Sequence, residues 1–179
     1  NNVIETAKNN QLQKDLLSAQ FQAKEQELNY LKHQIHPHFL FNTLNTIYGL
    51  SLEKSEKTPT VIMQLSGLLD YILYNTNKPE VSVEDEIEHI ENYIALEKVR
   101  FEDTLKVAFT KNISVNNAFL PPMLLIPFVE NAFKHGKIID DFLTIDITID
   151  ISETHLRFSI KNTYEKGDSK EGIGLKNIK

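Results

Sequence analysis

The stretch QIHPHFLFN, residues 34–42, interrupts a pattern that otherwise predicts one long helix. It places Pro37 between His36 and His38, and His33 lies just before it. A proline inside a helix removes a backbone donor and clashes with the preceding turn, at a cost of roughly 3 kcal/mol. The stretch therefore predicts a local kink in a helix, together with a function that offsets this cost.

Helical patterns lie on both sides of Pro37. Residues 10–31 are rich in Gln, Lys, Glu, Leu and Ala and contain neither Gly nor Pro, which is typical of a helix. Apolar residues form one coiled-coil-like stripe before the proline, at Leu17, Phe21, Leu28, Leu31 and Ile35. An apolar run over residues 39–50 resumes the helical period, and a second amphipathic helix is expected to start with Thr58 as its cap and Pro59 at the first helical position. Two such helices cannot bury this much apolar surface alone, so we expect a helical hairpin that dimerises into a four-helix bundle.

The second half of the chain has a different pattern. Turn-forming residues gather in NTNKPEVS, residues 75–82, and Ser82 with Asp85 then gives a helix start that resembles a capping box. The elements expected after it are a strand at 105–113, a helix in 121–136 that ends at Gly136, and an antiparallel strand pair at 143–151 and 155–161. These elements predict an α/β layer structure. We therefore expect a helical hairpin at 1–76, a linker at 77–82 and an α/β domain at 83–179.

Composition narrows the class of protein. The chain has 179 residues, of which 41% are hydrophobic and 25% charged, enough for a core and for two small domains. The net charge of -6 does not support nonspecific binding of nucleic acid, and the absence of cysteine excludes disulfides and thiolate metal sites. No apolar run reaches transmembrane length and no signal peptide is present, so we expect membrane contact only through segments outside these residues.

The histidines around Pro37 allow three interpretations. His33 and His36 are three residues apart on a helix, a spacing that suits a metal site, although Pro37 disrupts the register that would bring in His38. They also suit ordinary surface and helix-packing positions. In the third interpretation one histidine is a nucleophile, because imidazole can bond through one nitrogen while a neighbour orients the other.

The segment VENAFKHG provides polar groups that a nucleophilic histidine would need. Glu130, Asn131, Lys134 and His135 crowd the end of an apolar helix. A carboxylate, an amide oxygen and an ammonium group suit a base, a magnesium ligand and a phosphate contact. The glycine-rich turn GIG at 172–174 offers backbone amides to phosphate oxygens. Taken singly, each feature is better explained by an ordinary structural role: solvated helix polarity accounts for the first and a simple turn for the second.

Four motifs in this order resemble the landmarks of the LytS-type sensor histidine kinases of bacterial two-component systems. They are QIHPHFLFNTLNTI, VRFEDTL, PPMLLIPFVENAFKHG and GIGLKNIK. The first and third motifs are long and specific, and the resemblance extends from about residue 27 to the last residue. It implies that His38 is the site of autophosphorylation. Asn42, which ends the PHFLFN motif, joins it as a candidate catalytic residue, whereas His36 lies where the motif varies.

The resemblance also implies an ATPase domain similar to those of gyrase, Hsp90, histidine kinases and MutL. It assigns Asn131 as the magnesium ligand and Glu130 as a base or an organiser of water. Lys134 and His135 are expected near the phosphates of ATP. The second glycine box is matched by Gly172 and Gly174, after which the sequence ends, so we expect a domain that is incomplete at its C-terminal side.

One position departs from the wider ATPase superfamily. An aspartate that accepts a hydrogen bond from the adenine amino group is replaced here by Asn162, and no glycine pair follows it closely. An amide oxygen can still accept that hydrogen bond, but without the charge of a carboxylate. This departure favours an alternative function, a dimeric signalling scaffold or pseudokinase that binds nucleotide weakly.

The resemblance implies a complete signalling function. It is autophosphorylation of His38 from ATP and Mg²⁺, followed by transfer of the phosphoryl group to an aspartate of a response-regulator receiver domain. It further implies a homodimer without nucleic-acid partners, in the cytoplasmic portion of an inner-membrane sensor. A histidine-rich coiled coil that binds metal remains the second alternative.

Overall fold

The computed structural model describes residues 13–14, 16–22, 37–115 and 117–164. The chain divides into two compact units, residues 1–53 and 54–179. This division falls inside the segment 1–76, which the sequence analysis assigned to one helical hairpin. The four-helix bundle and the boundaries of the functional domains stay predictions. Among the described residues, no helix has the length and apolar character needed to cross a membrane.

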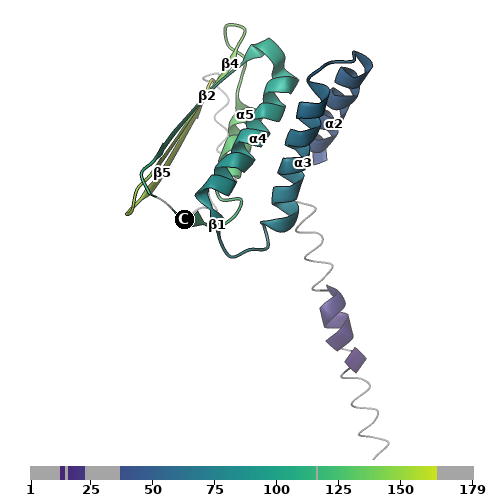
Figure 1. Cartoon of the computed structure of the whole chain (residues 1–179), viewed down its shortest axis with the longest axis vertical. Helices are drawn as coiled ribbons and strands as arrows, with labels where there is room; N and C mark the ends of the chain where they lie inside the picture. The colour runs from purple at the N-terminus through teal and green to yellow at the C-terminus, as the bar shows by residue number, and fades with distance from the viewer. Residues whose placement is uncertain (1–12, 15, 23–36, 116, 165–179) are drawn as a thin grey trace, which may run out of the picture. The chain divides into compact units, whose positions relative to one another are not determined.

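The described part of the first unit is helical up to Leu52, and Glu53 lies in the turn that follows. Residues 13–14 and 16–22 are helical, and α2 spans Pro37–Leu52 (Figure 1). Phe39 and Thr43 are the buried residues of α2, and the Thr43 hydroxyl donates to the Phe39 carbonyl at 2.9 Å. The kink expected before α2, together with His33, His36 and most of the coiled-coil stripe, lies outside the described residues.

The second unit is built in layers. It contains α3 (Thr58–Tyr74), α4 (Val83–Phe101), the short 3₁₀ helix η1 (Glu102–Thr104) and α5 (Ile126–His135). The larger sheet contains β2 (Leu105–Ile113), β4 (Leu143–Ile151) and β5 (Leu156–Asn162), and a small sheet pairs β1 (Val81–Ser82) with β3 (Phe119–Leu120). Helices α4 and α5 cover one face of the larger sheet, and α3 packs against α4 (Figure 1). The unit is therefore an α+β structure.

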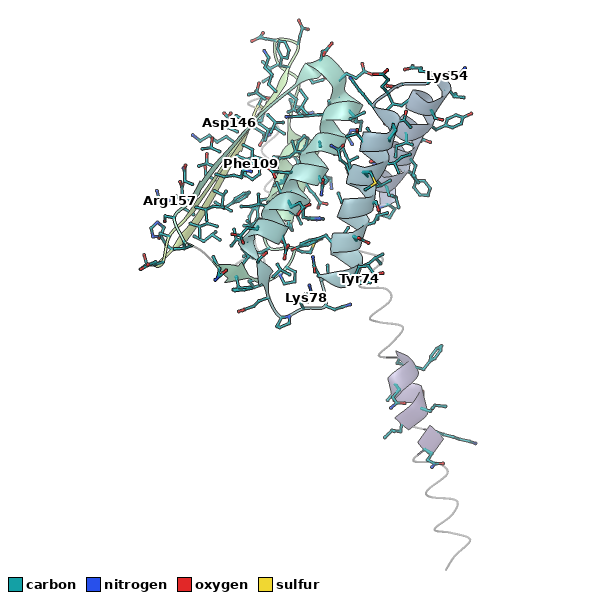
Figure 2. The ribbon with its side chains drawn as sticks, in the orientation of Figure 1. Lys54, Tyr74, Lys78, Phe109, Asp146 and Arg157 are labelled. Atoms are coloured by element: carbon teal, nitrogen blue, oxygen red, sulfur yellow. The ribbon has the colours of Figure 1, made fainter. Side chains whose placement is uncertain are left out.

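The larger sheet has the order β2-β4-β5, with β4 parallel to β2 and antiparallel to β5. Alternate residues of β4 are buried beneath the helices, namely Leu143, Ile145, Ile147, Ile149 and Ile151. The opposite face is polar, and Asp146 and Arg157 project from it (Figure 2). The predicted ranges of β2 and β4 are confirmed, and β5 lies one residue later than the predicted 155–161. One-sided burial imposes a period of two on the sequence, which makes such strands predictable.

Two helix starts differ in how they are capped. Ser82 caps α4 as predicted, since its hydroxyl oxygen accepts from the Asp85 backbone N–H at 3.1 Å. The prediction that Thr58 caps α3 was wrong. Its hydroxyl donates to the Ser55 carbonyl at 2.9 Å, and Lys57 occupies the cap position without a side-chain hydrogen bond. Thr58 is therefore the first residue of the helix and not its cap.

The end of α5 at Gly136 is confirmed, but for a different reason from the expected one. Gly136 has φ -63° and ψ 145°, an extended conformation open to any residue. The close neighbours require glycine instead, because a Cβ there would collide with the Leu143 side chain and the Ala132 carbonyl oxygen. The helix therefore ends where the chain passes directly over the start of β4.

Candidate functional site

The candidate nucleophile lies on the exposed surface of α2. His38 is exposed, and the side-chain amide nitrogen of Asn42 lies 3.2 Å from its Nδ1 and 3.4 Å from its Nε2. Residues four apart on a helix are neighbours on one face, which explains the contact. The amide nitrogen lies almost equally close to both ring nitrogens, so Asn42 contacts the imidazole without selecting one nitrogen as its acceptor.

The polar residues of α5 do not all face the same way. Ile126, Val129 and Phe133 form its buried face, whereas Asn131, Lys134 and His135 are exposed. The exposed residues are three and four apart and therefore share one surface of the helix. Glu130 alone is partly buried, on the side that faces α4.

Three residues of α4, Tyr93, Glu97 and Arg100, form a polar cluster, and the charge of Glu130 acts on Tyr93 and Glu97. Glu97 is buried, accepts a hydrogen bond from the Tyr93 hydroxyl at 3.0 Å and pairs with Arg100 at 2.6 Å. Burial raises the pKa of Glu97; the Arg100 charge and the Tyr93 hydrogen bond lower it, and the charge of Glu130 raises it further. Together with Glu130, the cluster consequently holds two carboxyl groups, a phenol and a guanidinium group at the interface of α4 and α5.

Sequence reasoning missed the α4 cluster. VRFEDTL was recognised as a motif without a role for Arg100, and no role was assigned to Tyr93 or Glu97 before it. The available signal was spacing, because Tyr93, Glu97 and Arg100 follow one another at intervals of four and three residues. Such spacing puts side chains on one helical face.

The end of β5 meets the end of α5. The Asn162 amide nitrogen donates to the Thr163 carbonyl at 3.1 Å, and it lies 3.5 Å from where a Cβ on Gly136 would stand. Thr163 joins the two elements, because Lys137 N–H donates to its carbonyl at 2.9 Å and its hydroxyl donates to the Lys137 carbonyl at 2.6 Å. Asn162 is thereby placed beside the end of the helix that carries Asn131.

Other candidate groups are not brought together by the structure. Gly172 and Gly174 lie outside the described residues. Within the described part of the chain, no cluster of three or more His, Asp or Glu residues could hold a metal ion. His38 lies in the first unit and α5 in the second.

Comparison with known proteins identifies the family. The family model for histidine kinases matches residues 26–105, which include all of α2, α3 and α4. The chain therefore belongs to the histidine kinase family, and His38, Asn42 and the α4 residues Tyr93, Glu97 and Arg100 lie in the matched segment.

The similar curated proteins are sensor kinases. The chain is 37% identical over 123 residues to Sensor protein kinase HptS from the USA300, NCTC 8325 / PS 47 and N315 strains of Staphylococcus aureus. The aligned residues make up 69% of this chain and 23% of each relative. The chain thus spans about a quarter of the length of these proteins, and it is related to sensor histidine kinases.

Proposed function

We propose that the chain is the catalytic core region of a two-component sensor histidine kinase. His38 accepts the γ-phosphoryl group of ATP and passes it to an aspartate of a response regulator. The observation that carries the proposal is the pairing of exposed His38 with Asn42, inside the segment that matches the family.

The geometry of His38 suits phosphoryl acceptance. An unprotonated ring nitrogen uses its lone pair to form the N–P bond as the bond between the γ-phosphorus and the ADP oxygen breaks. Asn42 limits rotation of the ring, so less rotational freedom is lost when the donor arrives. The other ring nitrogen releases its proton to solvent, for which the exposure of the side chain is sufficient.

The exposed face of α5 suits a nucleotide with magnesium. Within the described residues the Asn131 side chain makes no hydrogen bond to the protein, so its amide oxygen is available as a hard ligand. Lys134, one turn further on, provides a cation for phosphate oxygens. Magnesium would neutralise charge on the phosphates, while Glu130, turned toward α4, is suited to organising water or accepting a proton.

The partners follow from the same proposal. A receiver domain supplies the acceptor aspartate, a second copy of the chain completes the helical bundle, and the chain occupies the cytoplasmic portion of a membrane sensor. The exposed apolar side chains of α3, Ile62, Met63 and Leu73, support association through that helix.

Labelling of the full-length protein tests the proposal. With γ-labelled ATP and magnesium, the protein should acquire label that is lost in acid and retained in base, as expected for phosphohistidine. His38→Gln should abolish this labelling, and the control His36→Gln should retain most of it. Label that persists in the His38 variant would assign the reaction to another residue.

Asn162 favours one alternative, a dimeric scaffold that binds nucleotide weakly. A neutral amide replaces the carboxylate of related ATPases, and its nitrogen is engaged with Thr163. Calorimetric titration with ATP distinguishes the two functions, because a scaffold shows no magnesium-dependent binding.

A further inference from the structure

Glu86 on α4 connects three separate parts of the second unit. Its side chain is 0% exposed, and its carboxyl group accepts a hydrogen bond from the Tyr71 hydroxyl of α3. It also accepts from two backbone N–H groups of the loop before α5, from Met123 at 3.1 Å and from Leu125 at 2.9 Å. One side chain therefore joins α3, α4 and the start of α5.

Packing alone does not account for a carboxyl group at this position. A buried polar group is costly unless hydrogen bonds replace those lost to water, and an apolar side chain of similar size often serves stability as well. Unlike an apolar side chain, the carboxyl group accepts directional hydrogen bonds, and these fix the two backbone N–H groups of the loop.

The loop itself needs such an anchor. Met123 has φ 61°, a left-handed conformation that is strained for a non-glycine residue and persists only where its surroundings impose it. Leu125 is the N-cap residue of α5, and its own side chain makes no capping hydrogen bond. Glu86 thus fixes the loop from outside, at the strained residue and at the residue where α5 begins.

Tyr71 adds α3 to this arrangement. It is buried, its hydroxyl binds Glu86, and its ring stacks on His89 of α4 with a centroid separation of 4.2 Å. A shift of α3 along α4 would break the hydroxyl bond and change the environment of the carboxyl group that holds the loop.

We propose that Glu86 is a positioning residue that makes the start of α5, and with it the placement of Asn131 and Lys134, depend on the position of α3. The significance for nucleotide binding rests on the proposed kinase function. The structural link between Tyr71, Glu86 and the loop does not depend on that function.

Hydrogen exchange in the full-length protein measures the structural link between Tyr71, Glu86 and the loop. Because Pro121, Pro122 and Pro127 lack amide hydrogens, a peptide covering 121–127 reports only Met123 to Ile126. Glu86→Gln should accelerate exchange in this peptide by about tenfold, and Tyr71→Phe by a smaller factor. Exchange in β4 should stay unchanged in Tyr71→Phe, which removes one hydroxyl and keeps the packed ring.

Tyr74→Phe is the matched control. Tyr74 lies three residues further along α3 and is 70% exposed (Figure 2), so loss of its hydroxyl should leave exchange in 121–127 unchanged. Equal exchange in Tyr71→Phe and Tyr74→Phe would overturn the proposal, whatever the stability of Glu86→Gln.

The kinetics of His38 labelling provide the second readout. Tyr71→Phe should raise KM for ATP several-fold with little change in kcat, and Tyr74→Phe should change neither. An unchanged KM alongside accelerated exchange would contradict the link to Asn131 and Lys134. Absence of labelling in the unmodified protein would reject the kinase function, while the exchange result would still decide the role of Glu86.

Discussion

The amide nitrogen of Asn42 lies 3.2 Å from Nδ1 of His38, one helical turn away on α2. Both residues belong to the single motif PHFLFN, so the sequence already places them on one helical face. The contact suggests a physical role for Asn42 that the motif alone does not provide. We propose that it limits rotation of the ring that the proposed reaction uses.

Asn42→Ala should therefore slow labelling of His38 by roughly two- to tenfold, the effect of losing one neutral hydrogen bond. The initial rate at saturating ATP is the appropriate measurement, because the substitution leaves α5 untouched. Asn45→Ala is the control, since Asn45 is exposed on the same helix and the hydrogen bonds described for His38 involve Asn42 alone. Equal rates in the two variants would remove the orienting role from Asn42.

The ion pair on α4 joins the buried Glu97 to the partly exposed Arg100, and it predicts a loss of stability in Arg100→Leu. The variant leaves the Glu97 carboxyl group buried without its cation, and such losses cost about 3 kcal/mol. Lys111→Leu is the contrast, because its pair with Glu91, at 2.5 Å, is exposed and should contribute less than about 1 kcal/mol. Urea denaturation measures both, and equal losses would show that Arg100 does not stabilise Glu97.

The sequence predicted the sheet more successfully than the polar interior, and the role of His38 stays a prediction. Burial of one face marks β4 with alternation, which makes its limits readable. Glu86 and Glu97 carry no such mark, because a buried carboxyl group and a solvated one look alike in VEDEIEHIE and ALEKVR. Their burial depends on partners, Tyr71 and Arg100 among them, that only the packed helices identify.

His89 predicts how stability depends on pH. Burial lowers its pKa from 6.5 to about 4, and its Nδ1 has no hydrogen-bond partner among the described residues. Asp70, Asp85 and Glu88 line the same groove between α3 and α4, but they do not offset the burial. The folded protein therefore keeps His89 neutral, and the unfolded chain binds its proton more readily.

The contribution of His89 to stability is full above pH 6.5 and is lost as the pH falls toward 4, by up to about 3 kcal/mol. His89→Phe keeps an aromatic ring against Tyr71 and should remove this part of the pH dependence. The raised pKa of Glu97 acts in the opposite direction, but it is common to both proteins and cancels in their difference. Parallel curves of unfolding free energy against pH for the two proteins would contradict the assignment.

The last prediction separates the kinase from the scaffold, and it concerns Asn162. Asn162→Asp should tighten ATP binding roughly three- to tenfold, because a carboxylate accepts the adenine amino hydrogen bond with charge assistance. The substitution removes the donor to the Thr163 carbonyl, but that carbonyl also accepts from Lys137 N–H at 2.9 Å and so keeps a partner. Asn131→Ala should instead abolish the magnesium-dependent part of binding. Calorimetric titration with ATP, with and without magnesium, measures both effects. If the unmodified protein, Asn162→Asp and Asn131→Ala all fail to bind ATP, the chain is a scaffold and the kinase function is rejected.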